Sequence, residues 1–186
     1  MLQTRLSMME TSLEELRQRA AKIKWFFCDI DGTLTDGCVY YSPEGELLKK
    51  FSLRDGTGFF LLKQCGIKMG FITTENSPVV EQRAQKLKID KYIYGTHRKL
   101  DAMKEFVLSE NLTLENIAFI GDELNDVKLL KACGLGFAVS DADHRAKDAA
   151  CLICKKSGGN GAFREAVETL LELRGEDIDK IVDRAL

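Results

Sequence analysis

The chain has 186 residues, of which 45% are hydrophobic and 30% are charged, and its formal net charge at pH 7 is -2. This length and composition predict one compact globular domain with a sizeable core and argue against disorder. The small negative charge offers no strongly basic face for nucleic acid, so we expect a small-molecule partner and no nucleic acid.

The N-terminal residues lack the apolar core of a signal peptide, and no apolar run approaches the roughly 18 residues of a membrane span. We therefore expect a cytoplasmic protein with no membrane association. Six cysteines are scattered through apolar segments, which indicates reduced core residues and not a secreted disulfide framework. Cys151 and Cys154 form a C-x-x-C without a second pair of zinc ligands, so no zinc site is expected.

Helix and strand patterns follow one another along the chain. Ser12 and Glu15 predict a capping box at the start of a helix from Leu13 to about Lys22, which we interpret as an N-terminal helical extension over residues 1–22. Beyond it, short apolar runs typical of strands buried on both faces of a parallel sheet lie at 23–30, 68–72, 117–120 and 135–139. Helical patterns lie between them, at about 56–64, 78–87, 99–110 and 125–132.

This alternation predicts an α/β fold with a doubly wound parallel sheet of the Rossmann type, in one domain over residues 23–186. Residues 37–52 break the pattern. Two strand patterns, Val39–Tyr41 and Leu47–Phe51, flank the turn-forming segment 42–45, which predicts a β-hairpin projecting from the sheet. A glycine-rich tail and further helices are expected over about 157–186.

Acidic residues follow two of the predicted strands. Asp29 and Asp31 end the first strand on the same side of the sheet, and Gly32 then allows a sharp turn toward a phosphate. Asp122 and Asp126 follow the strand 117–120. In open α/β sheets, ligands bind at the carboxyl ends of the strands. Two such acidic clusters need a cation between them, and hard oxygen ligands favour Mg²⁺.

Two further residues complete a chemical set between the acidic clusters. Thr73 directly follows the apolar run 68–72, and Lys99 opens a predicted helix. A hydroxyl and an ammonium can hold phosphate oxygens and offset the charge of a nucleophilic carboxylate. Each motif alone most often marks a turn, a cap or a solvated surface, but the four in this order predict phosphoryl transfer.

The set resembles the four motifs of the haloacid dehalogenase superfamily. The matching residues are Asp29-Ile30-Asp31-Gly32-Thr33, Thr73, Lys99, and Gly121-Asp122 with Asp126. The resemblance implies that Asp29 attacks phosphorus to give an aspartyl phosphate, and that Asp31 protonates the leaving oxygen. It also implies a magnesium ion bound by the Asp29 side chain, the Asp31 carbonyl and Asp122. Asp126, Gly32 and Asn125 would have supporting roles. Asp126 would orient Lys99 or complete the outer metal shell.

The spacing leaves no room for the cap domain that many members carry, since about forty residues separate Asp31 from Thr73 and about twenty-six separate Thr73 from Lys99. A capless site stays open to water unless another chain covers it. We therefore expect a homo-oligomer in which neighbouring subunits shape the pocket.

Within the capless group, the chain is similar from about Ile23 to Leu173 to phosphatases of 3-deoxy-2-ketosugar acids. These are the 3-deoxy-D-manno-octulosonate 8-phosphate phosphatases and their relatives acting on nonulosonate 9-phosphates such as KDN 9-phosphate. The specific marks are the segments 35–37, 54–56 and 157–165. The resemblance implies a homotetramer whose hairpins associate and whose glycine-rich tail reaches a neighbouring site. Truncation beyond about Ser157 would then reduce catalysis more than stability.

The substrate itself stays open at this point. Arg54 and Arg164 suit a substrate carboxylate, because guanidinium pairs with it bidentately, although a surface ion pair is an equal alternative for each. After Thr73 the eight-carbon enzymes typically show Gly then Arg, whereas this chain has Thr74 and Glu75, with Lys86 one helix later. That combination is closer to the nine-carbon branch.

Two other classes remain alternatives to an enzyme of this family. A response-regulator receiver domain also places acidic residues, a threonine and a lysine around magnesium. A non-catalytic tetramerisation module, related to the C-terminal domains of sialic-acid cytidylyltransferases, shares the capless fold. The presence of Asp29, Asp31, Lys99 and Asp122 together favours the hydrolase.

Overall fold

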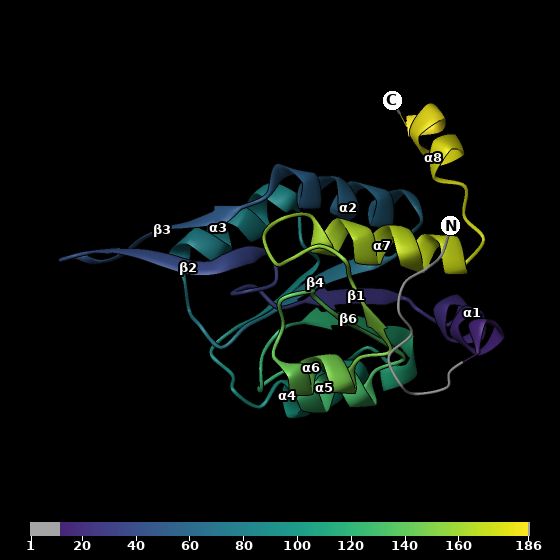
Figure 1. Ribbon diagram of the computed structural model, residues 1–186, viewed down its shortest axis with the longest axis horizontal. Coiled ribbons are helices and arrows are strands. Elements are labelled where there is room, and N and C mark those ends of the chain that lie inside the picture. Colours follow the sequence, from purple (N-terminus) through teal and green to yellow (C-terminus); the bar gives the residue numbers. More distant parts are fainter. Residues whose placement is uncertain (1–11, 186) are drawn as a thin grey trace.

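A computed structural model describes residues 12–185 of the chain (Figure 1). Its centre is a six-stranded parallel sheet in the order β5-β4-β1-β6-β7-β8. The strands are β1 (Trp25–Cys28), β4 (Lys68–Ile72), β5 (Lys91–Ile93), β6 (Ile117–Gly121), β7 (Leu135–Ala138) and β8 (Leu152–Ile153). The chain winds from β1 to one edge and then returns across β1 to the other, so the predicted doubly wound α/β fold is confirmed.

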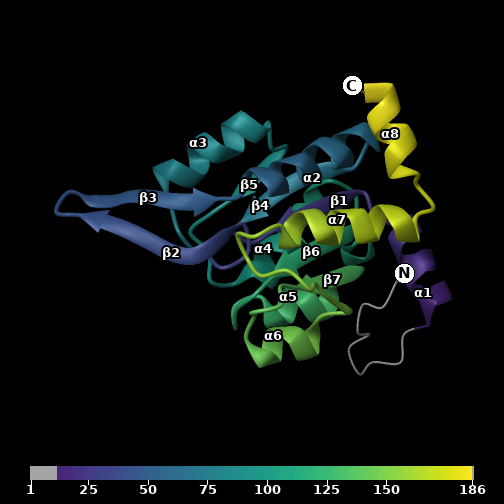
Figure 2. The same cartoon turned by 45° about the horizontal axis from the view of Figure 1, so that its top comes forward.

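Helices cover both faces of this sheet (Figures 1 and 2). One face carries α2 (Leu53–Gln64), α3 (Pro78–Leu87) and α7 (Ala162–Leu173), and the other carries α4 (Lys99–Ser109), α5 (Val127–Ala132) and α6 (His144–Ala149). The remaining helices are α1 (Leu13–Ala21), the 3-10 helix η1 (Leu114–Asn116) and α8 (Ile178–Ala185). Within residues 12–185, none of these helices has the length and apolar character needed to cross a membrane.

The hairpin projects from the sheet as expected (Figure 2). Its strands β2 (Thr35–Ser42) and β3 (Gly45–Phe51) pair in antiparallel fashion as a separate two-stranded sheet. Large apolar side chains lie exposed along it, namely Tyr40, Tyr41, Leu47 and Leu48. Between Asp31 and Lys99 the chain forms only this hairpin, α2, β4, α3 and β5, so no cap domain is inserted there.

The core is built around aromatic side chains of β1, α2 and α7. Phe26, Phe59 and Phe163 are all buried. The rings of Phe59 and Phe163 stack with centroids 4.1 Å apart, and Phe163 meets Phe26 edge to face at 5.3 Å. Phe163 therefore joins α7 to both the first strand and the helix that follows the hairpin.

Segments near both ends of the described chain pack against the domain. Leu16 and Ala20 of α1 are buried in the common core, so this helix packs as part of the domain; residues 1–11 of the expected extension lie outside the described residues. The glycine-rich segment packs on the chain's own loop, because a Cβ at Gly158 would lie 1.8 Å from the carbonyl oxygen of Gly32. That truncation beyond about Ser157 reduces catalysis more than stability stays a prediction. Such a truncation also removes α7, whose buried side chains belong to the core.

We expect Phe163→Ala to lower the free energy of unfolding by about 3–5 kcal/mol, because the substitution leaves a cavity beneath α7 that its neighbours cannot fill. Urea unfolding monitored by circular dichroism measures this change. Leu108→Ala on α4 is the matched control, since Leu108 is 76% exposed; it should stay within about 0.5 kcal/mol of the unmodified protein. Equal losses for the two variants would contradict this description of the core.

Candidate active site

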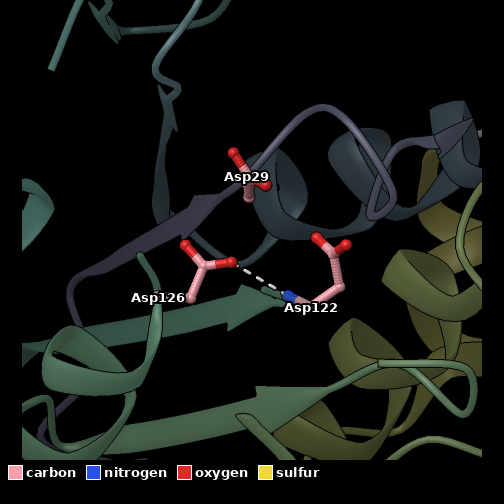
Figure 3. A group of neighbouring side chains, drawn as sticks. All are labelled: Asp29, Asp122 and Asp126. Atoms are coloured by element: carbon pink, nitrogen blue, oxygen red, sulfur yellow. Dashed lines mark hydrogen bonds between the residues drawn. The ribbon is translucent and has the colours of Figure 1, made fainter. Parts of the chain in front are cut away.

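Three of the expected acidic residues meet at the carboxyl edge of the sheet (Figure 3). Asp29 directly follows β1, while Asp122 and Asp126 follow β6, its parallel neighbour. Each residue offers one carboxylate oxygen, and these three oxygens all lie within 4.8 Å of one another. Adjacent parallel strands end at the same edge, so the two acidic motifs converge although more than 90 residues separate them in sequence.

The ammonium of Lys99 lies beneath this cluster. It is 2.6 Å from Asp29 Oδ1 and 2.6 Å from Asp126 Oδ1, and the lysine side chain is fully buried. Burial alone would lower the pKa of Lys99, but the two carboxylates raise it well above its ordinary value. Lys99 therefore stays charged and offsets part of the negative charge around Asp29.

Asp126 is fully engaged by protein donors. Its Oδ1 accepts from Lys99, and its Oδ2 accepts from the backbone N–H groups of Asp122 at 2.9 Å and Glu123 at 3.1 Å, the former drawn in Figure 3. Both oxygens are thus occupied. These contacts suit both roles expected for Asp126, which are to orient Lys99 or to complete the outer metal shell beside Asp122.

Asp122 is held against the turn after β1. The hydroxyl of Thr33 donates to Asp122 Oδ1 at 2.7 Å. Gly32 has a φ of +85°, and a Cβ there would lie 2.0 Å from Asp122 Oδ2. Only glycine therefore lets the two motifs approach this closely, a reason for Gly32 additional to the sharp turn that the sequence predicts.

The donor set at this edge fits magnesium. Burial raises the pKa of Asp122 to about 8, with a further contribution from the neighbouring Asp29 charge. Burial also raises the pKa of Asp29 to about 6, against the opposing effect of Lys99. Three carboxylates meet here, and the ammonium of Lys99 contacts two of them. Hard carboxylate oxygens are the ligands that Mg²⁺ prefers.

The second motif lies on the other side of β1. Thr73 follows β4, which pairs with β1, and it is buried. Its Oγ1 accepts from the backbone N–H of Glu75 at 3.3 Å, which leaves the hydroxyl proton available to a ligand. Thr74 and Glu75 form the start of the loop that leads to α3.

Asp31 is held by a residue that the sequence interpretation missed. Its Oδ1 lies 2.5 Å from the ammonium of Lys49, on β3 of the hairpin, and Lys49 also lies 3.5 Å from Glu46. The neighbouring Lys50 instead pairs with Asp36 at 3.0 Å and is exposed. Alternation along a strand places these two lysines on opposite faces, but the sequence does not say which face meets the domain.

Other expected residues are not brought into the cluster. Arg54 and Lys86 are exposed on α2 and α3, and Arg164 pairs with Glu168 at 2.8 Å. Among the described residues, none of these three side chains has an ion pair or hydrogen bond with Asp29, Asp122 or Asp126. Asn125 follows Asp122 on the same loop, and its Oδ1 is buried without a hydrogen-bond partner among the described residues.

The motif that contains Arg54 has a structural explanation. Asp55 is buried, and its carboxylate accepts the backbone N–H groups of Gly161 at 3.2 Å and Arg164 at 3.0 Å. These are donors at the start of α7, where a carboxylate is a favourable cap. Asp55 therefore fixes the glycine-rich segment that lies on the Gly32 turn.

Comparison with known proteins agrees with this geometry. A family model described as haloacid dehalogenase-like hydrolase matches residues 89–165. A crystal structure of 3-deoxy-D-manno-octulosonate 8-phosphate phosphatase from Moraxella catarrhalis, in complex with magnesium, phosphate and KDO, is 35% identical. It has a TM-score of 0.88, and the match covers 94% of this chain and all of that one. The fold and the site thus define a hydrolase of this superfamily.

Relatives of the same description cover most of the sequence. The 8-phosphate phosphatase of Haemophilus influenzae is 34% identical over 161 residues, which are 87% of this chain and 89% of that protein. A cobalt-bound structure from the same species is 35% identical with a TM-score of 0.81, covering 85% of this chain and 92% of that one. The chain therefore belongs to the 3-deoxy-D-manno-octulosonate 8-phosphate phosphatase family, which confirms the predicted resemblance and makes it a phosphatase.

We expect magnesium to stabilise the protein more at pH 8 than at pH 6. The raised pKa values of Asp29, about 6, and Asp122, about 8, mean that the folded metal-free chain binds more protons than the unfolded chain between about pH 4 and about pH 8. Stability of the metal-free form therefore falls as pH rises through this range, and a bound cation removes that loss. Thermal unfolding with and without MgCl₂ at the two pH values measures the difference.

Asp122→Asn is the control for this measurement, because it removes one ligand and one negative charge without changing the size of the side chain. The variant should lose most of the magnesium-induced increase in melting temperature. An increase of the same size at both pH values in the unmodified protein would contradict the proposed charge balance.

Proposed function

We propose that the chain is a magnesium-dependent phosphomonoesterase that hydrolyses a 3-deoxy-2-ketosugar acid phosphate through an aspartyl phosphate on Asp29. The observation that carries the proposal is the buried Asp29 carboxylate, held by Lys99 through Oδ1 and facing Asp122. The substrate class is supported by the names of the relatives, which specify 3-deoxy-D-manno-octulosonate 8-phosphate, and by the Moraxella complex with KDO.

Magnesium would be held by the side chains of Asp29 and Asp122 and by the backbone carbonyl of Asp31. When bound, it supplies positive charge that lets an anionic nucleophile approach an anionic phosphate ester and polarises the phosphoryl group. Asp126 and Lys99 would not be ligands of the metal, because they pair with each other.

In the first step, a carboxylate oxygen of Asp29 forms a bond to phosphorus while the bond between phosphorus and the sugar oxygen breaks. The electron pair of the broken bond stays on the sugar oxygen, which takes a proton from Asp31. Lys99 orients Asp29 and offsets its charge. The hydroxyl of Thr73 donates to a phosphate oxygen, because its own oxygen already accepts from Glu75.

In the second step, water attacks the phosphorus of the aspartyl phosphate and gives its proton to Asp31. The bond between phosphorus and Asp29 breaks, inorganic phosphate leaves, and both aspartates return to their starting states. Repeated turnover by this cycle separates the proposal from the receiver-like alternative, which stops at a single phosphorylation, and from the tetramerisation module, which releases no phosphate.

We expect Asp29→Asn to reduce phosphate release by about 10³-fold or more, because the neutral amide lacks the anionic oxygen that attacks phosphorus. Steady-state release of phosphate from 3-deoxy-D-manno-octulosonate 8-phosphate measures this loss, and circular dichroism checks the fold. Asp179→Asn, which changes an exposed aspartate on α8, should retain full activity. Substantial turnover by the Asp29 variant would contradict the assignment.

The proposed substrate-binding residues act at the sugar. Thr74 and Glu75 follow Thr73 at the rim, and Glu75 and Lys86 are exposed and so free to meet a ligand. The names of the relatives support the eight-carbon 8-phosphate as the principal substrate. The combination of Glu75 and Lys86 supports a nonulosonate 9-phosphate as the alternative.

We expect kcat/KM for the eight-carbon 8-phosphate to exceed that for KDN 9-phosphate by about tenfold, which corresponds to about 1.4 kcal/mol of differential transition-state binding. Steady-state kinetics with both esters under one set of conditions measures the ratio. A larger kcat/KM for the nine-carbon ester would reverse the choice and assign Glu75 and Lys86 to its recognition.

Self-association completes the proposal. Exposed apolar side chains of the hairpin, from Tyr40 to Leu48, are of the kind that marks a protein interface and support a homotetramer. In such an assembly Arg54, which has no ion-pair partner among residues 12–185, would be available to a substrate carboxylate in a neighbouring site. Arg164 is less available because it pairs with Glu168. All six cysteines are unpaired, which supports a cytoplasmic setting.

A further inference from the structure

Lys49 joins the hairpin to the loop that carries Asp31. Its ammonium lies 2.5 Å from Asp31 Oδ1, and only 1% of its side chain is exposed. We propose that Lys49 is a positioning residue for the phosphatase reaction, which holds Asp31 by Oδ1 so that Oδ2 faces the leaving oxygen of the substrate. This inference rests on the acid-base role proposed above for Asp31.

The second oxygen of Asp31 supports this assignment. Asp31 Oδ2 is buried and has no hydrogen-bond partner among the described residues. A buried polar atom without a partner is unfavourable, and such atoms are retained where a ligand supplies the missing bond. The hydroxyl that forms as the sugar leaves, and later the attacking water, are partners of the required chemistry.

Lys49 is itself held from a second side. Its ammonium lies 3.5 Å from Glu46 Oε2, and the other oxygen of Glu46 accepts a hydrogen bond from the hydroxyl of Ser77. Ser77 is the N-cap of α3, where its oxygen accepts the backbone N–H of Val80 at 3.3 Å. A side chain with four rotatable bonds is therefore fixed between the hairpin, α3 and Asp31.

This arrangement is not that of an ordinary surface ion pair. Burying an ammonium is unfavourable unless it is paired and hydrogen-bonded, and the buried Lys49 ammonium meets two half-buried carboxylates, Asp31 and Glu46. Lys50, the next residue along β3, makes an exposed pair with Asp36. The two lysines share a strand and a charge but differ in burial, so they form a matched pair for an experiment.

A positioning role predicts a dependence on the leaving group. General acid catalysis requires the donor oxygen to lie within hydrogen-bond reach of the leaving oxygen. A sugar alkoxide needs that proton, whereas 2,4-dinitrophenolate leaves as a stable anion without it. Displacing Asp31 should therefore slow the first step for a sugar phosphate and spare it for the dinitrophenyl ester, while general damage to the fold would slow both equally.

The experiment measures release of the leaving group in a single turnover with enzyme in excess. The probes are 3-deoxy-D-manno-octulosonate 8-phosphate and 2,4-dinitrophenyl phosphate, and the readout is the ratio of the two rate constants, which does not depend on the fraction of active protein. Lys49→Met should lower this ratio by about 10- to 100-fold. Lys50→Met should leave it unchanged. If Lys49→Met does not fold, Lys49→Gln is measured in the same way and should lower the ratio.

Combination with Asp31→Asn tests whether Lys49 acts through Asp31. Asp31→Asn alone should lower the ratio, and adding Lys49→Met should lower it no further, since the two changes remove one function. An unchanged ratio in the Lys49 variants, or a full additional decrease in the double variant, would overturn the positioning role. If the unmodified enzyme releases no leaving group from either ester, the proposed function is contradicted. This measurement is made before the variants are compared, so the two failures are distinguishable.

Discussion

Mutual repulsion among closely spaced carboxylates is the constraint on which this structure depends. Asp29, Asp122 and Asp126 place oxygens within 4.8 Å of one another at one edge of the sheet, and such a group cannot be fully ionised without cations. The chain supplies one, the buried ammonium of Lys99, which contacts Asp29 and Asp126. Among the described residues no ammonium or guanidinium pairs with Asp122, which accepts the hydroxyl of Thr33. The remaining negative charge suits the edge to a divalent metal, and the metal's charge then favours an anionic phosphate ester.

Two segments distant in sequence, the glycine-rich segment and the hairpin, hold the turn after β1 in place. Asp55 on α2 caps the start of α7 and fixes the glycine-rich segment, and Gly158 then lies directly on the Gly32 carbonyl. From the opposite side, Lys49 of the hairpin holds Asp31. The hairpin therefore has two ends with different properties, a polar base against the active site and an apolar tip exposed to solvent.

Much of this organisation could be predicted from sequence because its determinants are local. The strand β1 was predicted from a continuous apolar run, and Asp29 and Asp122 from their positions after such runs. The two-residue strand β8 and the short helix α6 were missed, since they are too short to show a periodic pattern. Lys49 was missed for another reason, because its role depends on which face of the hairpin packs against the domain.

The chain ends show the same limit. The sequence predicts that the glycine-rich segment reaches a neighbouring site, but it does not reveal the packing of this segment on the Gly32 turn of the same chain, which depends on a close backbone approach. The candidate arginine Arg164 was chosen for its chemistry, but Glu168 one helical turn away already occupies it. The roles of residues that belong to a local sequence motif could therefore be predicted. The roles of residues that depend on contacts with distant parts of the chain could not.

Anomalous diffraction from crystals soaked with Mn²⁺, a stand-in for Mg²⁺, tests the central claim most directly. The charge balance described above predicts one strong peak at the β1–β6 edge, at about 2.0–2.2 Å from an oxygen of Asp29 and an oxygen of Asp122. Manganese bound only elsewhere on the chain, with these two carboxylates left uncoordinated, would contradict it.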